Sequence, residues 1–293
     1  MSDLPLPDPA ESKALDIQHD TDLEPDHGIA RRIPHLGHAL LFFSLVGFCL
    51  ALATVIIYGT ARIHTQAAIL AHPGLALFAQ GAGYAAAFAI SFWIFPRLWN
   101  RGFFDGVHWN GLVAKRHWVQ IVITGVLLSF AAQFAMHYVT PPDNAPIDEM
   151  FANTHLIWYM TFFAILLGPF MEELAFRGFL LPALATAYDW LALDRTPAAL
   201  DRWQRSAAHS TQALIFSALV SSIPFALLHA AQISYAWGVV GILYCVSVSL
   251  SVVRVRTQSL ACSTLLHATY NSVIFVFLFI SSSGFRHLEK VGH

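Results

Sequence analysis

Seven long apolar runs constrain this 293-residue chain more than any other feature of its sequence. A helix needs about 20 apolar residues to cross a hydrocarbon core about 30 Å thick. The composition agrees, because 56% of the residues are hydrophobic and only 12% are charged, whereas soluble domains have about 25% charged residues. We therefore predict an all-α, polytopic transmembrane helical bundle with about seven membrane helices, or eight if one is split or interfacial. The predicted spans are residues 38–61, 75–95, 119–139, 156–188, 213–231, 237–253 and 259–281.

The rest of the sequence predicts one membrane domain between two tails. Residues 1–33 are acidic, rich in Pro and Asp and poor in aromatic residues, which is typical of a disordered segment. They lack the basic start, apolar core and cleavage site of a secretory signal peptide. Residues 34–285 hold spans too closely spaced for a second soluble domain, and residues 286–293 form a short tail.

Lys and Arg are distributed unevenly between the two sides of the predicted bundle. If the N-terminus is cytoplasmic, the outer side holds only Arg62, Arg286 and Lys290. The inner side then holds Arg31, Arg32, Arg97, Arg101, Lys115, Arg116, Arg195, Arg202, Arg205, Arg254 and Arg256. Because cytoplasmic loops carry an excess of Lys and Arg, we predict a cytoplasmic N-terminus in a multi-pass plasma-membrane protein, and the Ala-rich composition favours a prokaryotic source.

Two classes of function find no support in the composition. A formal net charge of -2 and the absence of a basic run argue against a nucleic-acid partner. The three cysteines, Cys49, Cys245 and Cys262, fall in predicted spans without metal-ligand spacing, so we interpret them as packing residues.

The stretch "GPFMEELAFRG", residues 168–178, places three charges inside a predicted span. One charge at the centre of a membrane helix costs roughly 2.5 to 3.5 kcal/mol, so the three need compensation. Glu173 and Arg177 are spaced i,i+4 in the order that favours an ion pair. Glu172 points about 100° away around the helix and needs a partner from another helix.

Glu172 is accordingly the residue of this stretch that we predict to take part in the chemistry, because a carboxylate in an apolar pocket suits general-base catalysis. A structural polar cluster or a transport path is the alternative for the three charges. Pro169, and again Pro182, predict distortion of this helix, since proline removes a backbone donor and clashes with the preceding turn.

Two further polar pairs lie on apolar helices. "FALLH" places Phe225 and His229 one turn apart, and "HATYN" does the same for His267 and Asn271. A lone histidine on an apolar helix is more often a packing residue. Two histidines, an asparagine and an unpaired glutamate favour one shared site, because buried polar groups need one another. Counting from the predicted helix ends nevertheless places the two histidines about 10 to 15 Å apart in depth.

The residue types fit two kinds of hydrolytic chemistry. A glutamate and a histidine can take a proton from water, while a second histidine and an asparagine amide stabilise the oxyanion of an attacked carbonyl. Alternatively, Glu172, His229 and His267 hold zinc, which leaves one position for water. The HExxH and GxSxG motifs of other hydrolases are absent, and the Tyr188–Asp189 pair lacks the GxGD motif of aspartyl proteases.

Together the three motifs, within residues 156–277, resemble the CPBP family of type II CAAX prenyl endopeptidases, bacteriocin-processing enzymes and lysostaphin-resistance-protein-like members. The family pattern is EExxxR, often EExxFRG, followed by FxxxH and by HxxxN or HxxxD. The resemblance implies an intramembrane endopeptidase that cuts near the C-terminus of a membrane-associated protein or peptide, prenylated or not. It implies that Glu172 and His229 activate water and that His267 and Asn271 form the oxyanion hole.

The resemblance further implies supporting roles for Glu173, Arg177 and Phe225. We expect no required cofactor, with zinc as the alternative. A non-catalytic scaffold or immunity protein is a second reading, but binding alone does not require Glu172 and both histidines. A proton-coupled transporter is a third, and no inverted repeat of broken helices supports it.

Overall fold

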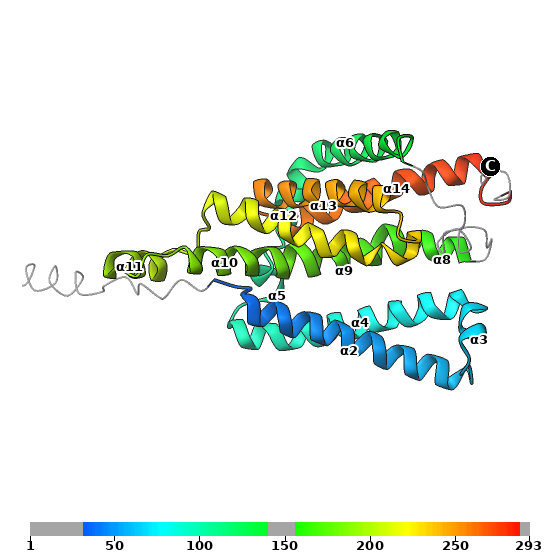
Figure 1. Cartoon of the computed structure of the whole chain (residues 1–293), viewed down its shortest axis with the longest axis horizontal. Helices are drawn as coiled ribbons and strands as arrows, with labels where there is room; N and C mark the ends of the chain where they lie inside the picture. Colours follow the sequence, from blue (N-terminus) through cyan, green and yellow to red (C-terminus); the bar gives the residue numbers. More distant parts are fainter. Residues whose placement is uncertain (1–31, 140–155, 288–293) are drawn as a thin grey trace, which may run out of the picture. The chain divides into compact units, whose positions relative to one another are not determined.

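Helices form all the regular structure of the described residues, which are 32–139 and 156–287 of the computed structural model (Figure 1). Seven of these helices are long and apolar enough to cross a membrane, so the predicted all-α fold and number of spans are confirmed, while the ends differ from the predicted ones by up to eight residues. They are α2 (Leu36–Thr60), α4 (Pro73–Trp99), α6 (Gly111–Met136), the composite helix Leu156–Leu191, α12 (Thr211–Leu228), α13 (Trp237–Thr257) and α14 (Leu260–Ser281). Most of the two predicted tails lies outside the described residues.

Short helices occupy the connections. They are α3 (Gln66–Leu70), α5 (Phe103–Gly106), α11 (Pro197–Arg205) and the 3₁₀ turn η3 (Ala231–Ile233). Residues 33–192 and 209–293 belong to one compact unit, which contains all seven spans. Arg32 and α11 belong to a separate small unit, in which the Arg32 guanidinium lies 3.5 Å from the centroid of the Trp203 ring.

The composite helix Leu156–Leu191 carries the glutamate motif and contains two π-helical segments. In chain order it consists of α8 (Leu156–Phe162), η1 (Phe163–Leu167), α9 (Gly168–Glu173), η2 (Leu174–Leu180) and α10 (Leu181–Leu191). Both η1 and η2 are π-helical, with one residue more per hydrogen-bonded turn than the α-helix.

Each π-helix ends immediately before a proline-containing turn. The Gly168 N–H donates to the Phe163 carbonyl five residues back, and Pro169 follows. The Leu181 N–H likewise donates five residues back, and Pro182 follows. Because a proline ring clashes with the carbonyl four residues earlier, the wider π turn makes room for it. The predicted distortion at both prolines is therefore present as π-helix.

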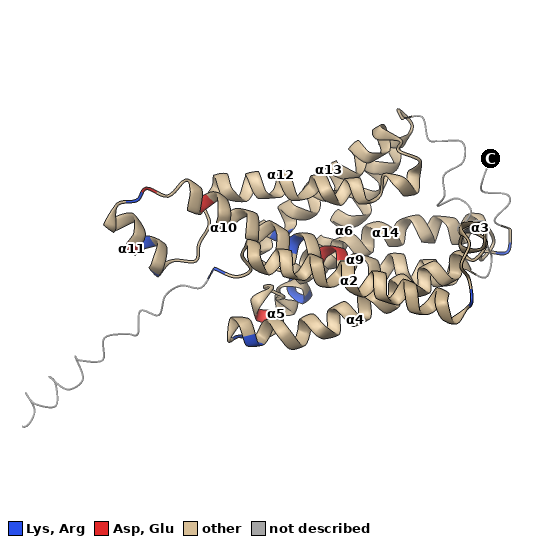
Figure 2. Cartoon of the chain, turned by 60° about the horizontal axis from the view of Figure 1, so that its bottom comes forward, with Lys and Arg blue, Asp and Glu red and all other residues tan. Residues whose placement is uncertain are grey.

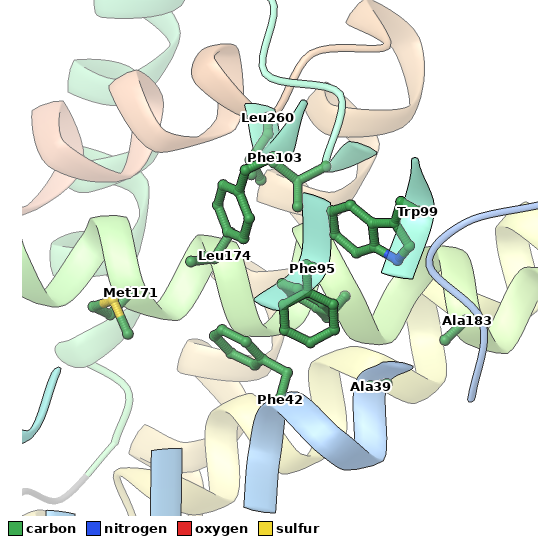
Figure 3. Close-up of a cluster of buried hydrophobic side chains, with 11 residues drawn as sticks. Ala39, Phe42, Phe95, Trp99, Phe103, Met171, Leu174, Ala183 and Leu260 are labelled. Carbon is green, nitrogen blue, oxygen red and sulfur yellow. The ribbon is translucent and has the colours of Figure 1, made fainter. Parts of the chain in front are cut away.

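An aromatic cluster attaches the first spans to the motif helix (Figure 3). The Phe42 ring of α2 stacks on Phe179 of η2 with centroids 4.2 Å apart, and Phe95 of α4 lies 4.7 Å from the same ring. Trp99 and Phe103 extend the cluster from the end of α4 into α5. Helices without a recognised motif thus hold the motif helix in place through buried aromatic surface, which is a large contribution to packing.

A close approach between α6 and α14 holds the histidine-bearing helix. A Cβ atom on Gly125 would lie 2.9 Å from the Thr269 Cβ and 3.0 Å from the Leu266 carbonyl oxygen. Small residues at membrane helix contacts let backbones approach in this way. Glycine at position 125 is therefore required for α6 to pack beside His267.

Helices α12 and α13 and the start of α14 carry many buried serines. The fully buried ones are Ser217, Ser221, Ser222, Ser247, Ser251, Ser259 and Ser263. Figure 2 shows that the long helices are mostly uncharged, with acidic and basic residues at α9 and beside it. The charges of the motif helix therefore lie close to helices that carry small hydroxyl side chains.

Candidate active site

Two neighbouring glutamates at the end of α9 differ in their access to water. The Glu173 side chain is fully buried, whereas the Glu172 side chain is 23% exposed. A general base must reach the proton that it abstracts. Of the two carboxylates, Glu172 is therefore the one accessible enough for the role predicted from the sequence, and that role stays a prediction.

Arg177 on η2 is a fully buried cation with several partners. The predicted i,i+4 ion pair is present, because its Nη1 donates to Glu173 Oε1 at 2.8 Å. Its Nη2 donates to the Ser247 carbonyl and hydroxyl at 2.6 and 2.7 Å, and its Nε donates to Ser251 Oγ at 3.2 Å. The guanidinium also lies 4.7 Å from the Phe225 ring centroid. These contacts satisfy the buried charge and attach η2 to α13 and α12.

His267 on α14 lies between the two carboxylates. Its Nδ1 is 3.1 Å from Glu173 Oε1, and its Nε2 is 3.7 Å from Glu172 Oε2. A carboxylate accepts hydrogen bonds, so Nδ1 carries a proton and Glu173 sets the orientation of the ring. The partner that Glu172 requires from another helix is thus His267.

His229 follows the last residue of α12, and its ring is held by its own helix. Its backbone N–H donates to the Ala226 carbonyl at 3.2 Å, three residues back, which leaves the Phe225 carbonyl to the His229 Nδ1 at 3.0 Å. A carbonyl only accepts, so Nδ1 is the protonated nitrogen and Nε2 is an acceptor in the neutral ring. The one-turn spacing therefore places the Phe225 carbonyl within reach of the His229 ring.

The Phe225 ring connects the two histidines. Its centroid is 5.2 Å from that of His229 and 5.8 Å from that of His267. Both histidines therefore lie against the same aromatic ring.

Asn271, one turn after His267, contacts the motif helix upstream of the glutamates. Its Nδ2 donates to the Ala164 carbonyl of η1 at 2.7 Å. Glu172, His267 and Asn271 thus belong to one contact between α14 and the motif helix. His229 joins them through the Phe225 ring.

Arg254 lies in the last turn of α13, beyond the predicted end of that span at residue 253. Helix α13 continues to Thr257, and Arg254 is 5% exposed, within electrostatic reach of Glu173. The helix continues because the segment has no Gly or Pro before Gln258 to end it. Arg254 follows Ser247 by seven residues and Ser251 by three, so all three lie on one face of α13. This spacing could have indicated from the sequence that Arg254 is on the face that contacts Arg177.

Tyr84 on α4 is a second residue that the motifs did not indicate. Its hydroxyl accepts a hydrogen bond from Gln80 Nε2 at 3.3 Å and lies within electrostatic range of Glu172. Its ring stacks on Phe163 of η1 with centroids 6.0 Å apart. No periodicity distinguishes this tyrosine from a packing residue, so only the tertiary structure places it near the glutamate.

The histidine nitrogens define what could bind a metal. The Nδ1 atoms of His229 and His267 are engaged with protein acceptors, which leaves their Nε2 atoms and the Glu172 carboxylate as the donors of the predicted zinc set. Among residues 32–139 and 156–287, no group of three His, Cys, Asp or Glu side chains is arranged to hold a metal ion. The zinc alternative stays a prediction for experiment.

Comparison with known proteins agrees with the motifs. Residues 154–273 match the family described as type II CAAX prenyl endopeptidase Rce1-like. The matched segment contains the whole contact formed by Glu172, His229, His267 and Asn271. No curated protein and no solved structure matches the chain.

Proposed function

We propose that this chain, whose residues 154–273 are a domain of the Rce1-like type II CAAX prenyl endopeptidase family, is an intramembrane endopeptidase that uses a glutamate to activate water. Family membership implies a protease within a multi-pass membrane protein. One observation supports the glutamate mechanism most directly: the partly exposed Glu172 carboxylate lies 3.7 Å from the His267 Nε2.

In the proposed reaction, Glu172 accepts a proton from a water molecule that the His229 Nε2 helps to hold. The water oxygen forms a bond to the carbonyl carbon of the scissile peptide. The carbon–nitrogen bond then breaks, and Glu172 returns the proton to the leaving nitrogen. His229 is suited to holding the water because its Nδ1–H is occupied by the Phe225 carbonyl.

The oxyanion formed on attack requires hydrogen-bond donors. We propose that the doubly protonated His267 donates from Nε2 and that the second amide hydrogen of Asn271 contributes. Glu173 and Arg177 hold His267 and η2 in place without contacting the substrate. The apolar surroundings fit a membrane-associated protein or peptide cleaved near its C-terminus, with or without a prenyl group.

The test uses the full-length protein purified in detergent, a prenylated CAAX peptide and a panel of unprenylated membrane peptides. Wild type is compared with Glu172→Gln, which keeps the shape and removes the base. We expect wild type to hydrolyse at least one of the peptides. The Glu172→Gln variant should not hydrolyse that peptide, and its thermal midpoint should equal that of wild type. Glu172 is suited to this comparison because its oxygens accept no hydrogen bond within 3.5 Å from the described residues.

Chelation separates the two mechanisms. Hydrolysis that persists in chelator supports glutamate-activated water, whereas loss in chelator with recovery on added zinc supports the metal set. Binding of a peptide without cleavage would favour the scaffold, and uptake of protons coupled to solute transport in vesicles would favour the transporter. Either outcome contradicts the proposal.

A further inference from the structure

Among the described residues, the Ala164 carbonyl in η1 has no backbone donor from its own helix. In an α-helix it would accept from residue 168, but the Gly168 N–H is bound to the Phe163 carbonyl. In the π register it would accept from residue 169, and Pro169 has no N–H. A carbonyl without a donor inside a membrane protein must be satisfied by another group.

Asn271 supplies that group from a different helix. Its Nδ2 lies 2.7 Å from the Ala164 oxygen. The bond joins α14 to the motif helix eight residues before Glu172, about 12 Å along the axis. One turn earlier on α14, His267 contacts Glu173 at 3.1 Å, so the two helices are joined at two levels.

We infer that Asn271 is a positioning residue, whose hydrogen bond to Ala164 sets the rotation and sliding of α14 against the motif helix. Two attachments at different levels fix both motions, whereas one would leave the His267 ring free to move away from Glu172. The proline that widens the helix thereby creates the acceptor that holds the histidine helix. The catalytic consequence rests on the function proposed above, but the hydrogen bond between the helices does not.

The experiment is a double-substitution cycle between Asn271 and Pro169. Asn271→Leu removes the donor with little change in volume, and Pro169→Ala restores a backbone N–H that can satisfy Ala164 from within its own helix. We measure kcat/KM for peptide hydrolysis and the thermal midpoint in detergent for wild type, both single variants and the double variant. Pro182→Ala is the matched control, because it also follows a π-helix but does not supply a donor to Ala164.

Asn271→Leu is expected to lower kcat/KM by on the order of tenfold to a hundredfold and to lower the thermal midpoint by several degrees. In the Pro169→Ala background both losses are expected to be smaller, and the kcat/KM loss that persists there measures the Asn271 amide hydrogen offered to the oxyanion. In the Pro182→Ala background they are expected to stay as large as in wild type.

Equal losses from Asn271→Leu with and without Pro169→Ala would overturn the inference and leave Asn271 as a donor to the substrate alone. If Asn271→Leu prevents folding, the amount of folded protein in the membrane fraction becomes the measurement, and absence of rescue by Pro169→Ala again overturns it. The thermal cycle needs no substrate. A chain that hydrolyses nothing therefore refutes the proposed function without deciding the role of Asn271.

Discussion

Removing the Arg177 side chain provides the sharpest test of how the motif helix tolerates its charges. Arg177→Met keeps an apolar stem but leaves Glu173 as a buried carboxylate without its cation, and it leaves the acceptors on Ser247 and Ser251 without a donor. Breaking a buried pair by removing one partner costs about 3 to 5 kcal/mol. We expect a loss of that size in the free energy of unfolding.

An exposed pair at the same spacing is the matched control. Arg205 Nε and Asp201 Oδ1 are 2.9 Å apart at i,i+4, but their side chains are 60% and 51% exposed, against 1% and 0% for Arg177 and Glu173. Exposed helix pairs contribute about 0.3 to 0.5 kcal/mol. Arg205→Met is therefore expected to change stability by no more than that.

The measurement is reversible unfolding in mixed detergent micelles, followed by circular dichroism. Adding Glu173→Gln to Arg177→Met removes the unpaired charge, so the double variant should recover part of the loss. Equal effects of Arg177→Met and Arg205→Met would refute the reasoning. So would a double variant less stable than Arg177→Met alone.

Three further outcomes are expected. Gly125→Ala should lower the thermal midpoint, because overpacking against α14 outweighs the gain in helix propensity of about 1 kcal/mol. Gly47→Ala is the control and should not lower the midpoint, because a Cβ atom at position 47 would meet nothing within 4 Å. Ser247→Ala should lower the free energy of chemical unfolding by about 1.5 to 3 kcal/mol, because the Ser247 hydroxyl accepts a hydrogen bond from the charged Arg177. Ser249→Ala is the control and should lower it by less than about 1 kcal/mol, because it loses a hydrogen bond only to its own helix. Partial desolvation lowers the pKa of His35, whose ring accepts a hydrogen bond from the Gly37 N–H in the first turn of α2. The stability that His35 contributes should therefore be full above about pH 6.5 and fall with the pH toward the lowered value. His35→Asn should reduce this fall in amide exchange measured across pH.

Local sequence was sufficient to predict the fold class and the motif residues. Apolar runs of spanning length give seven helices irrespective of how they pack, since each helix satisfies its own backbone in lipid. The i,i+4 spacing of Glu173 and Arg177 predicts their ion pair for the same reason, because both residues lie on one helix. The prolines at 169 and 182 predict distortion, since the missing N–H is a property of the residue itself.

Contacts between helices required the tertiary structure, because their register depends on side chains distant in sequence. His267 rather than His229 contacts Glu172 because the Gly125 contact and the hydrogen bond between Asn271 and Ala164 fix α14. Arg254 is buried because α13 continues past the predicted end of its span. Sequence by itself determined which residues are polar in an apolar setting, and only the packing of separate helices decided which of them meet.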